Sequence, residues 1–124
     1  MATLSIRIDL GGEGRIGPGK IDLLEAIRRE GSISAAGRAM DMSYRRAWDL
    51  VDETTRICGR PVVASQTGGK HGGGARLTDF GEELIARYRA IEKAAARAAR
   101  AELAALQSGT QPADIGIKRE PDAA

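Results

Sequence analysis

Apolar residues occupy every second position near the start of the chain, over residues 3–10. Leucine and isoleucine side chains would share one face of an extended segment and polar side chains the other, which predicts a half-buried strand. The apolar positions are Leu4, Ile6, Ile8 and Leu10. Residues 11–19 are rich in glycine, and we expect an irregular connection there.

Helical spacing begins after this connection. Ile21, Leu24 and Ile27 recur at intervals of three residues, which predicts a first helix over about residues 18–30 that ends at Gly31.

Two more helices are predicted in close succession. Ser34 is expected to cap a short helix that ends near Met40, and Ser43 to cap a second that runs to about Cys58. Because only two residues separate them, the pair has the outline of a helix-turn-helix. The face of the second helix that should pack inward contains Ala47, Leu50, Val51, Thr54 and Cys58.

The second half of the chain predicts a β-hairpin and then a long helix. Residues 62–66 and 74–78 are strand-like segments on either side of a glycine-rich loop, an arrangement known as a wing. Thr78 is expected to cap a helix over residues 79–107, on the order of 40 Å long at ~1.5 Å per residue.

The predicted fold class is therefore mainly α with a small β-hairpin wing. We expect one winged helix-turn-helix domain over residues 1–107, which includes the long carboxyl-terminal helix as a dimerisation element. Residues 108–124 are polar and interrupted by proline, and we expect them to be a disordered tail.

Composition argues against several classes of protein. The 124 residues include one cysteine and one histidine, so we expect no disulfide, metal site or cofactor. No nucleophile–base pair or carboxylate dyad can be assembled from the sequence, and we do not expect an enzyme. There is no apolar run long enough for a membrane span and no signal-peptide pattern, so we expect a cytoplasmic protein without a membrane partner.

The distribution of charge is more informative than its total. The net charge is only +2, but residues 31–78 contain seven arginine and lysine residues and four acidic ones. A basic middle segment is typical of a protein with one anionic partner surface, and nucleic acid is the first candidate.

Candidate DNA contacts lie in the first turn of the helix predicted to begin after Ser43. Arg45 and Arg46 can bind guanine O6 and N7, and the hydroxyls of Ser43 and Tyr44 can bond to phosphates or bases. The alternative is a capped and solvated helix start, but the preceding helix and the hairpin favour DNA binding. Trp48 borders the apolar face, so we expect it to pack in the core, with contact at the DNA groove as the alternative.

The glycine-rich loop of the wing is a second candidate contact, because lysine and backbone amides commonly bind phosphate. The alternative is a loop with one incidental lysine. The full candidate set for DNA binding is Ser34, Ser43, Tyr44, Arg45, Arg46, Trp48, Thr67, Lys70, His71 and Arg76.

Two glycine motifs resemble nucleotide-binding loops but lack the required context. Residues 12–17 match GxGxxG, yet the segment after the next helix predicts another helix and not the second parallel strand of a dinucleotide fold. Residues 68–74 resemble a P-loop, but His71 follows Lys70 where that motif needs serine or threonine. Neither is interpreted as a nucleotide site.

Three segments carry a family resemblance. They are Gly-Ser-Ile-Ser-Ala-Ala at 31–36, Ser-Tyr-Arg-Arg-Ala-Trp-Asp at 43–49, and Thr-Gly-Gly-Lys-His-Gly-Gly-Gly-Ala-Arg-Leu-Thr-Asp-Phe-Gly at 67–81. Together they resemble the amino-terminal DNA-binding domain of the ModE family, which are molybdate-dependent bacterial transcriptional regulators. The resemblance covers about residues 3–105. It implies a winged helix related to that of LysR-type regulators, which binds DNA and dimerises through its helices.

Full-length members of that family continue into small β-barrel domains that bind molybdate. No segment of this sequence predicts such a barrel, so the resemblance implies DNA binding and dimerisation, and we do not expect molybdate binding.

The long helix is the expected dimer interface. It is longer than the core of so small a domain requires, and a symmetric partner helix would bury its apolar stripe. The alternative is a solvated alanine-rich helix stabilised by propensity alone. The expected interface residues are Leu84, Tyr88, Ile91, Ala95 and Ala98.

These predictions together describe a homodimeric transcriptional regulator that binds double-stranded DNA. The helix over residues 43–58 would enter the major groove, and the wing over residues 67–74 would contact the backbone. Two alternatives stay open. One is a short partner that heterodimerises with a full-length ModE-type regulator and modulates it, and the other is a stand-alone sensor of a small oxyanion.

Overall fold

The structure is a computed structural model that describes residues 2–66 and 74–109. Its elements follow the order β1 (Ile8–Asp9), β2 (Arg15–Ile16), α1 (Pro18–Glu30), α2 (Ile33–Ala39), α3 (Tyr44–Cys58), β3 (Val63–Gln66), β4 (Gly74–Leu77), α4 (Asp79–Ala98) and α5 (Arg100–Gly109). This is the predicted fold, a mainly helical winged helix-turn-helix with a small antiparallel hairpin.

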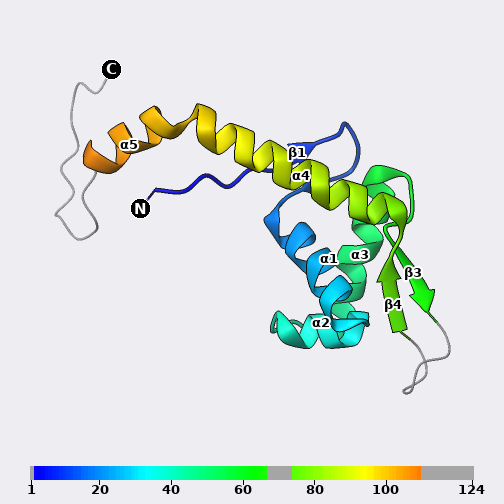
Figure 1. The fold of residues 1–124 in the computed structure, drawn as a ribbon. Helices are drawn as coiled ribbons and strands as arrows, with labels where there is room; N and C mark the ends of the chain where they lie inside the picture. Colours follow the sequence, from blue (N-terminus) through cyan, green and yellow to red (C-terminus); the bar gives the residue numbers. More distant parts are fainter. Residues whose placement is uncertain (1, 67–73, 110–124) are drawn as a thin grey trace.

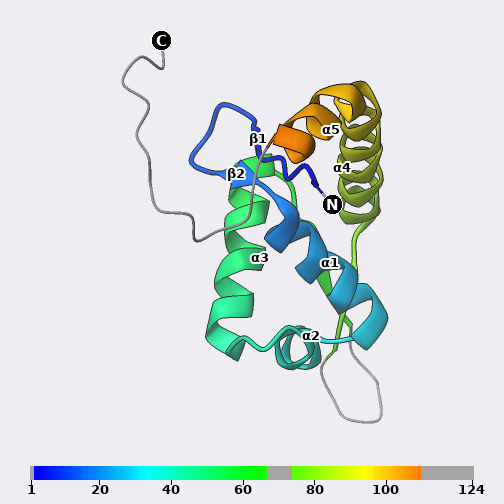
Figure 2. The same ribbon diagram turned by 90° about the vertical axis from the view of Figure 1, so that its left-hand side faces the viewer.

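Three helices and the β3–β4 hairpin form the body of the molecule (Figure 1). α4 crosses this body, and its second half extends away from it and leads into α5. Turned by 90°, α1 lies between α3 and α4 (Figure 2). The apolar core is therefore built around α1, whose Ile21, Leu24 and Ile27 are fully buried, as the helical spacing predicts.

Local signals in the sequence fix most helix ends. Pro18 occupies the first turn of α1, where its fixed φ suits a helix and its missing N–H costs nothing. Gly31 ends α1 in the left-handed region at φ 82°, and its N–H donates to the Ile27 carbonyl at 2.9 Å. α3 begins as predicted, because the Ser43 hydroxyl accepts a bond from the Arg46 N–H at 3.0 Å.

The cap of α2 lies two residues earlier than predicted. Ser32, and not Ser34, accepts the backbone N–H bond, from Ala35 at 3.0 Å. Ser34 lies inside the helix, where its hydroxyl accepts a bond from Arg38 at 3.0 Å. The prediction failed because one serine stands directly before this short helix and another in its first turn, and only the extended backbone of Ser32 allows the capping geometry.

α2 and α3 are joined by a tight turn. Asp41 adopts φ 57°, the left-handed conformation that aspartate tolerates better than most residues. The Met42 N–H then donates to the Gly37 carbonyl at 2.9 Å. A side chain at Gly37 would come within 3.3 Å of the Ala47 methyl group, so this glycine lets α2 pack closely on the start of α3.

The hairpin is attached to the body through the Thr78 side chain. β3 and β4 pair antiparallel, with Val63 opposite Leu77 and Gln66 opposite Gly74. The Thr78 hydroxyl accepts the Gly81 N–H at 3.0 Å, which caps α4 as predicted, and donates to the Pro61 carbonyl at 2.8 Å. One residue thus fixes both the start of α4 and the chain that enters β3.

Two predictions about element length are wrong. The predicted strand over residues 3–10 is confined to Ile8–Asp9, because its only partner in the described residues is the two-residue strand Arg15–Ile16. Leu4 and Leu10 are accordingly exposed. The glycine-rich connection, expected to be irregular, supplies that partner strand.

The predicted continuous helix over residues 79–107 is interrupted at Ala99, whose ψ of 2° lies outside helical values. Alanine and arginine on both sides are good helix formers, so nothing in the sequence marks this break. Ser108 and Gly109, assigned to the tail by prediction, belong to α5, and residues 110–124 lie outside the described part of the chain. None of the described helices is long and apolar enough to span a bilayer.

Candidate nucleic-acid interface

α3 presents three different surfaces around its circumference. Successive residues turn by about 100°, so side chains three and four apart share a side. The inward side is buried and consists of Ala47, Leu50, Val51 and Thr54. The Thr54 hydroxyl is satisfied there, because it donates to the Leu50 carbonyl at 2.7 Å. The remaining sides face solvent and contain the predicted DNA contacts.

The side directed away from the core carries charges of both signs. We call it the outer ridge, and it consists of Arg45, Asp49, Asp52 and Arg56. Arg45 pairs with Asp49 at 3.8 Å, and Arg56 pairs with Asp52 at 2.8 Å. These two pairs leave the ridge with no net charge, and Arg46 beside Arg45 makes no ion pair within the described residues.

The side of α3 nearest the hairpin carries two aromatic residues. Tyr44 is 57% exposed and Trp48 43% exposed, and the Trp48 indole N–H donates to the Tyr44 hydroxyl at 2.6 Å. The expectation that Trp48 packs in the core is wrong. The position it occupies, one turn after Tyr44, lies beside the core face and is left uncovered because the hairpin stands away from it.

Tyr44 and Trp48 line a groove of about 600 Å³ between α2, α3 and the hairpin, which we call the wing-side groove. Ser34 lines it from α2, and Ser65 and Gln66 line it from β3. The last two were not predicted from sequence. Their strand-like, polar segment offered no signal beyond its position next to the loop.

The remaining predicted DNA contacts fall into three groups. Ser43 and Arg46 lie at the start of α3, where the Ser43 hydroxyl serves as a cap. Arg76 is exposed on β4. Thr67, Lys70 and His71 lie outside the described residues.

The seam between α1 and α4 contains a dense ionic cluster. Arg89 of α4 donates to Asp22 at 2.8 Å, to Glu25 at 2.7 Å and to Glu92 at 2.8 Å. The hydrogen bond from Arg89 lowers the pKa of Glu25, and the same bonds raise the pKa of Arg89 above its usual range. Arg28 pairs with Glu82 across the same two helices.

The predicted dimer residues occupy two environments. Tyr88 is buried in the protein's own core, where its hydroxyl donates to the Ile6 carbonyl at 2.8 Å, and Leu84 packs against that core. Ile91 is 46% exposed, Ala98 is exposed and Ala95 is half-buried. Only the second group is open to another chain, because the first packs against residues of the same chain.

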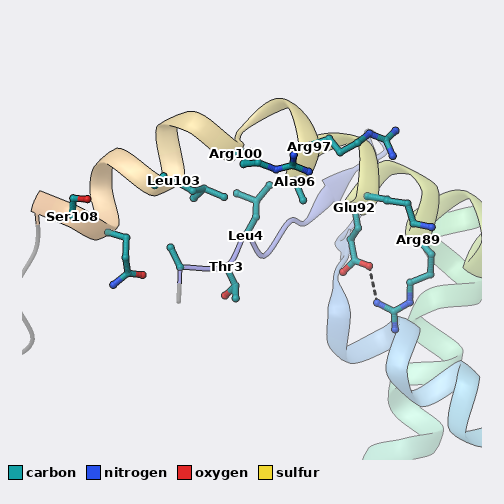
Figure 3. Close-up of a pocket in the computed structure, with 13 residues that line it drawn as sticks. Thr3, Leu4, Arg89, Glu92, Ala96, Arg97, Arg100, Leu103 and Ser108 are labelled. Carbon is teal, nitrogen blue, oxygen red and sulfur yellow. Dashed lines mark hydrogen bonds and ion pairs between the residues drawn. The ribbon is translucent and has the colours of Figure 1, made fainter.

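A groove of about 1030 Å³ lies between the amino-terminal segment, residues 2–4, and the second half of α4 together with α5, which we call the α4–α5 arm (Figure 3). Leu4 lines it from one side and Leu103 from the other, with Ala96 between Arg97 and Glu92 along the helix. Beyond it Leu106 is 63% exposed. The arm thus leaves apolar surface uncovered in a single chain.

Within the described part of the chain, no group of three His, Cys, Asp or Glu side chains is arranged to hold a metal ion.

No family model matches the chain. Individual relatives do. The chain is 41% identical over 92 residues to the molybdenum transport protein ModE of Azotobacter vinelandii, which covers 74% of this chain and 33% of that protein.

Two further relatives show the same pattern. The molybdenum-pterin-binding protein MopB of Rhodobacter capsulatus is 51% identical over 83 residues, which cover 67% of this chain and 31% of MopB. The DNA-binding transcriptional dual regulator ModE of Escherichia coli is 42% identical over 71 residues, which cover 57% of this chain and 27% of that protein. The chain spans about a third of the length of these relatives, and over the matched residues it is similar to proteins of the ModE family.

Proposed function

We propose that this chain is a transcriptional regulator that binds duplex DNA through the first turn of α3 and the hairpin. The observation that carries the proposal is the exposed Arg45–Arg46 pair at the start of the second helix of a helix-turn-helix. Relatives named transcriptional regulator ModE in Haemophilus influenzae and DNA-binding transcriptional dual regulator ModE in Escherichia coli support it.

The charge pattern of α3 indicates how the helix would approach DNA. Asp49 and Asp52 on the outer ridge would repel phosphates along the middle of the helix. Arg45 and Arg46 precede them, so the amino-terminal end of α3 is the end that a major groove would accept. Each arginine can make a bidentate bond to guanine, worth ~1–3 kcal/mol of discrimination.

The wing-side groove would accept the less polar parts of the duplex. Tyr44 and Trp48 offer apolar faces suited to thymine methyl groups or sugar edges, and Gln66 and Ser65 offer hydrogen-bonding groups on the opposite wall. The loop between β3 and β4 contributes Thr67, Lys70 and His71 toward the backbone in this proposal.

The α4–α5 arm is the proposed dimer interface. Ile91, Leu103 and Leu106 leave apolar surface uncovered, and a second copy of the chain is the simplest cover, because a two-fold axis brings the same patch from both sides. A dimer would place two α3 helices on two half-sites about one helical turn, or a multiple, apart.

Selection of bound fragments from random duplexes tests DNA binding, symmetry and spacing together. Purified protein should enrich a two-fold symmetric site and bind it more tightly than an unrelated duplex of equal length by a factor of at least ~10³. Enrichment of no sequence, with weak binding to all duplexes, would contradict the proposal.

Ile91→Glu tests the dimer. A buried, unpaired carboxylate at the interface should split the dimer in light scattering and leave a weak half-site binder. Ala86→Glu, at an exposed position in the first half of α4, is the matched control and should remain dimeric. A wild-type chain that is monomeric at tens of micromolar would contradict this part of the proposal.

A second candidate function is binding of a molybdenum compound, because two relatives from Rhodobacter capsulatus, MopA and MopB, are named molybdenum-pterin-binding proteins. Each is matched over about a third of its length only. Calorimetry with molybdate and tungstate separates this function from DNA binding, because heat of binding without DNA present would support it.

A further inference from the structure

The side of α3 opposite the wing-side groove has a different character. There, α3, the start of α1 and the β1–β2 hairpin enclose a cleft of about 540 Å³, which we call the amino-terminal cleft. Four cationic side chains line it: Arg7, Arg15, Lys20 and Arg46. No acidic residue of the described chain is among those that line it.

The charges of the cleft are only partly neutralised by the protein itself. Lys20 pairs with Glu53 at 3.4 Å. Arg15 stands opposite Asp9 in the β1–β2 register, but the Asp9 carboxylate accepts a bond from the Gly11 N–H at 2.8 Å. Within the described residues, Arg7, Arg15 and Arg46 make no ion pair. Gathering unpaired like charges is unfavourable unless a partner of opposite charge offsets it.

The fold positions these arginines in a specific way. A side chain at Gly17 would lie 2.8 Å from Cγ of Arg7, so this glycine lets the Arg7 stem lie across the start of α1. The pairing of Arg15–Ile16 with Ile8–Asp9 brings Arg15 to the same place, and β2 contacts α3. In Figure 2 β2 and the first turn of α1 lie beside α3. Residues from three separate segments thus converge on one side of α3.

We propose that the amino-terminal cleft binds the sugar-phosphate backbone of the duplex whose major groove α3 enters. This inference rests on the proposed function. Arg46 connects the two surfaces, because it belongs both to the first turn of α3 and to the lining of the cleft. A duplex at α3 is then held on two sides, by the β3–β4 hairpin and by the cleft.

The wing-side groove, whose one charged lining residue in the described chain is Asp52, and the cationic cleft would serve different parts of recognition. Contacts to phosphate fix register and orientation and depend strongly on salt, whereas contacts to base edges carry sequence preference. Removing charge from the cleft should therefore weaken binding to all duplexes by a similar factor and leave the preferred sequence unchanged.

The test uses the full chain and fluorescence anisotropy on a selected site and on an unrelated duplex, at several concentrations of KCl. Arg7→Gln/Arg15→Gln removes two charges and keeps most of each stem. It should weaken binding to both duplexes about tenfold or more near 0.1 M salt and reduce the slope of log K against log salt by about 1.8 per protomer. Arg87→Gln removes an exposed arginine of α4 and should leave the slope unchanged.

Arg7→Lys/Arg15→Lys keeps the charges and should retain the wild-type slope, which separates loss of charge from loss of structure. Equal slopes for wild type and the double glutamine variant, both folded by circular dichroism, would overturn the cleft proposal and leave DNA binding by α3 intact. A wild-type chain that binds neither duplex would instead overturn the proposed function and the cleft with it.

Discussion

Arginine serves two different purposes at two places in this protein. At the seam between α1 and α4, Arg89 bonds to three carboxylates of its own chain, and Arg28 bonds to a fourth. At the start of α3 and in the amino-terminal cleft, Arg7, Arg15 and Arg46 make no ion pair within the described residues. The residue is arginine at both places, and the difference is whether acidic side chains lie close enough to pair with it.

The difference shows how to distinguish a structural cation from a binding one. Arg89 connects residues far apart in the sequence, so its bonds stabilise the packing of α4 on α1. Its effect on a partner is visible in the lowered pKa of Glu25. An exposed arginine without an acid contributes little to the fold, and its charge remains available to a polyanion.

Removing the arginines at the start of α3 should give the largest effect on binding. Arg45→Ala/Arg46→Ala should cost about 2–6 kcal/mol of DNA binding free energy, at ~1–3 kcal/mol for each lost contact. Both side chains are exposed, so the free energy of unfolding should change by no more than about 0.5 kcal/mol. Anisotropy and urea denaturation measure the two quantities. Unchanged affinity would remove α3 as the contact helix.

Arg89→Ala should produce the reverse pattern. It leaves Asp22, Glu25 and Glu92 clustered without their cation, and the free energy of unfolding should fall by about 1–3 kcal/mol, since bonds to charged groups are worth ~1.5–3 kcal/mol and this side chain is 34% exposed. DNA affinity of the folded fraction should be unchanged. Arg87→Ala, whose exposed pair with Glu83 lies within α4, is the control and should leave stability unaltered. Loss of affinity without loss of stability would mean that Arg89 also contacts DNA.

Much of this contrast could not be predicted from sequence, for a physical reason. Helix ends are encoded within a few residues, so Ser43, Thr78 and Gly31 were predicted as caps and ends from local pattern alone. The amino-terminal cleft joins Arg7 and Arg15 to Arg46, and the seam joins Asp22 to Arg89. Such pairings depend on how the helices and strands pack, and the spacing of residues along the chain does not predict them.

The candidate DNA surface was predicted in part for the same reason. The exposure of Arg45 follows from its position opposite the apolar face of α3. Trp48 lies at the border of that face, where helical spacing does not decide between core and surface. Only the position of the hairpin leaves it exposed.

Acid titration tests the contribution of the Arg89–Glu25 bond to the stability of the fold. Because the bond from Arg89 lowers the pKa of Glu25 in the folded state, the ionised carboxylate stabilises the fold above the unfolded pKa of ~4.3. That contribution is lost as the pH falls through the folded pKa. Wild type should therefore exceed Glu25→Gln in stability by about 1 kcal/mol at pH 7, and the difference should shrink toward zero below about pH 4. A difference that is constant from pH 7 to pH 3 would contradict the role of the Glu25 charge.

The smallest expected effect concerns an acid on the outer ridge. Asp52 lines the wing-side groove and pairs with Arg56 one turn later, so it places a negative charge next to the proposed path of the duplex. Asp52→Asn removes this repulsion and frees Arg56, and affinity for any duplex should rise about two- to threefold at low salt and less at high salt, where screening is stronger. Glu83→Gln breaks a pair of the same spacing on α4 and should change nothing, because that helix lies outside the proposed interface. Weaker binding by Asp52→Asn would mean that the carboxylate accepts a bond from a base and is a specificity contact, whereas equal gains in both variants would mean that net charge alone, and not the position of the outer ridge, governs binding.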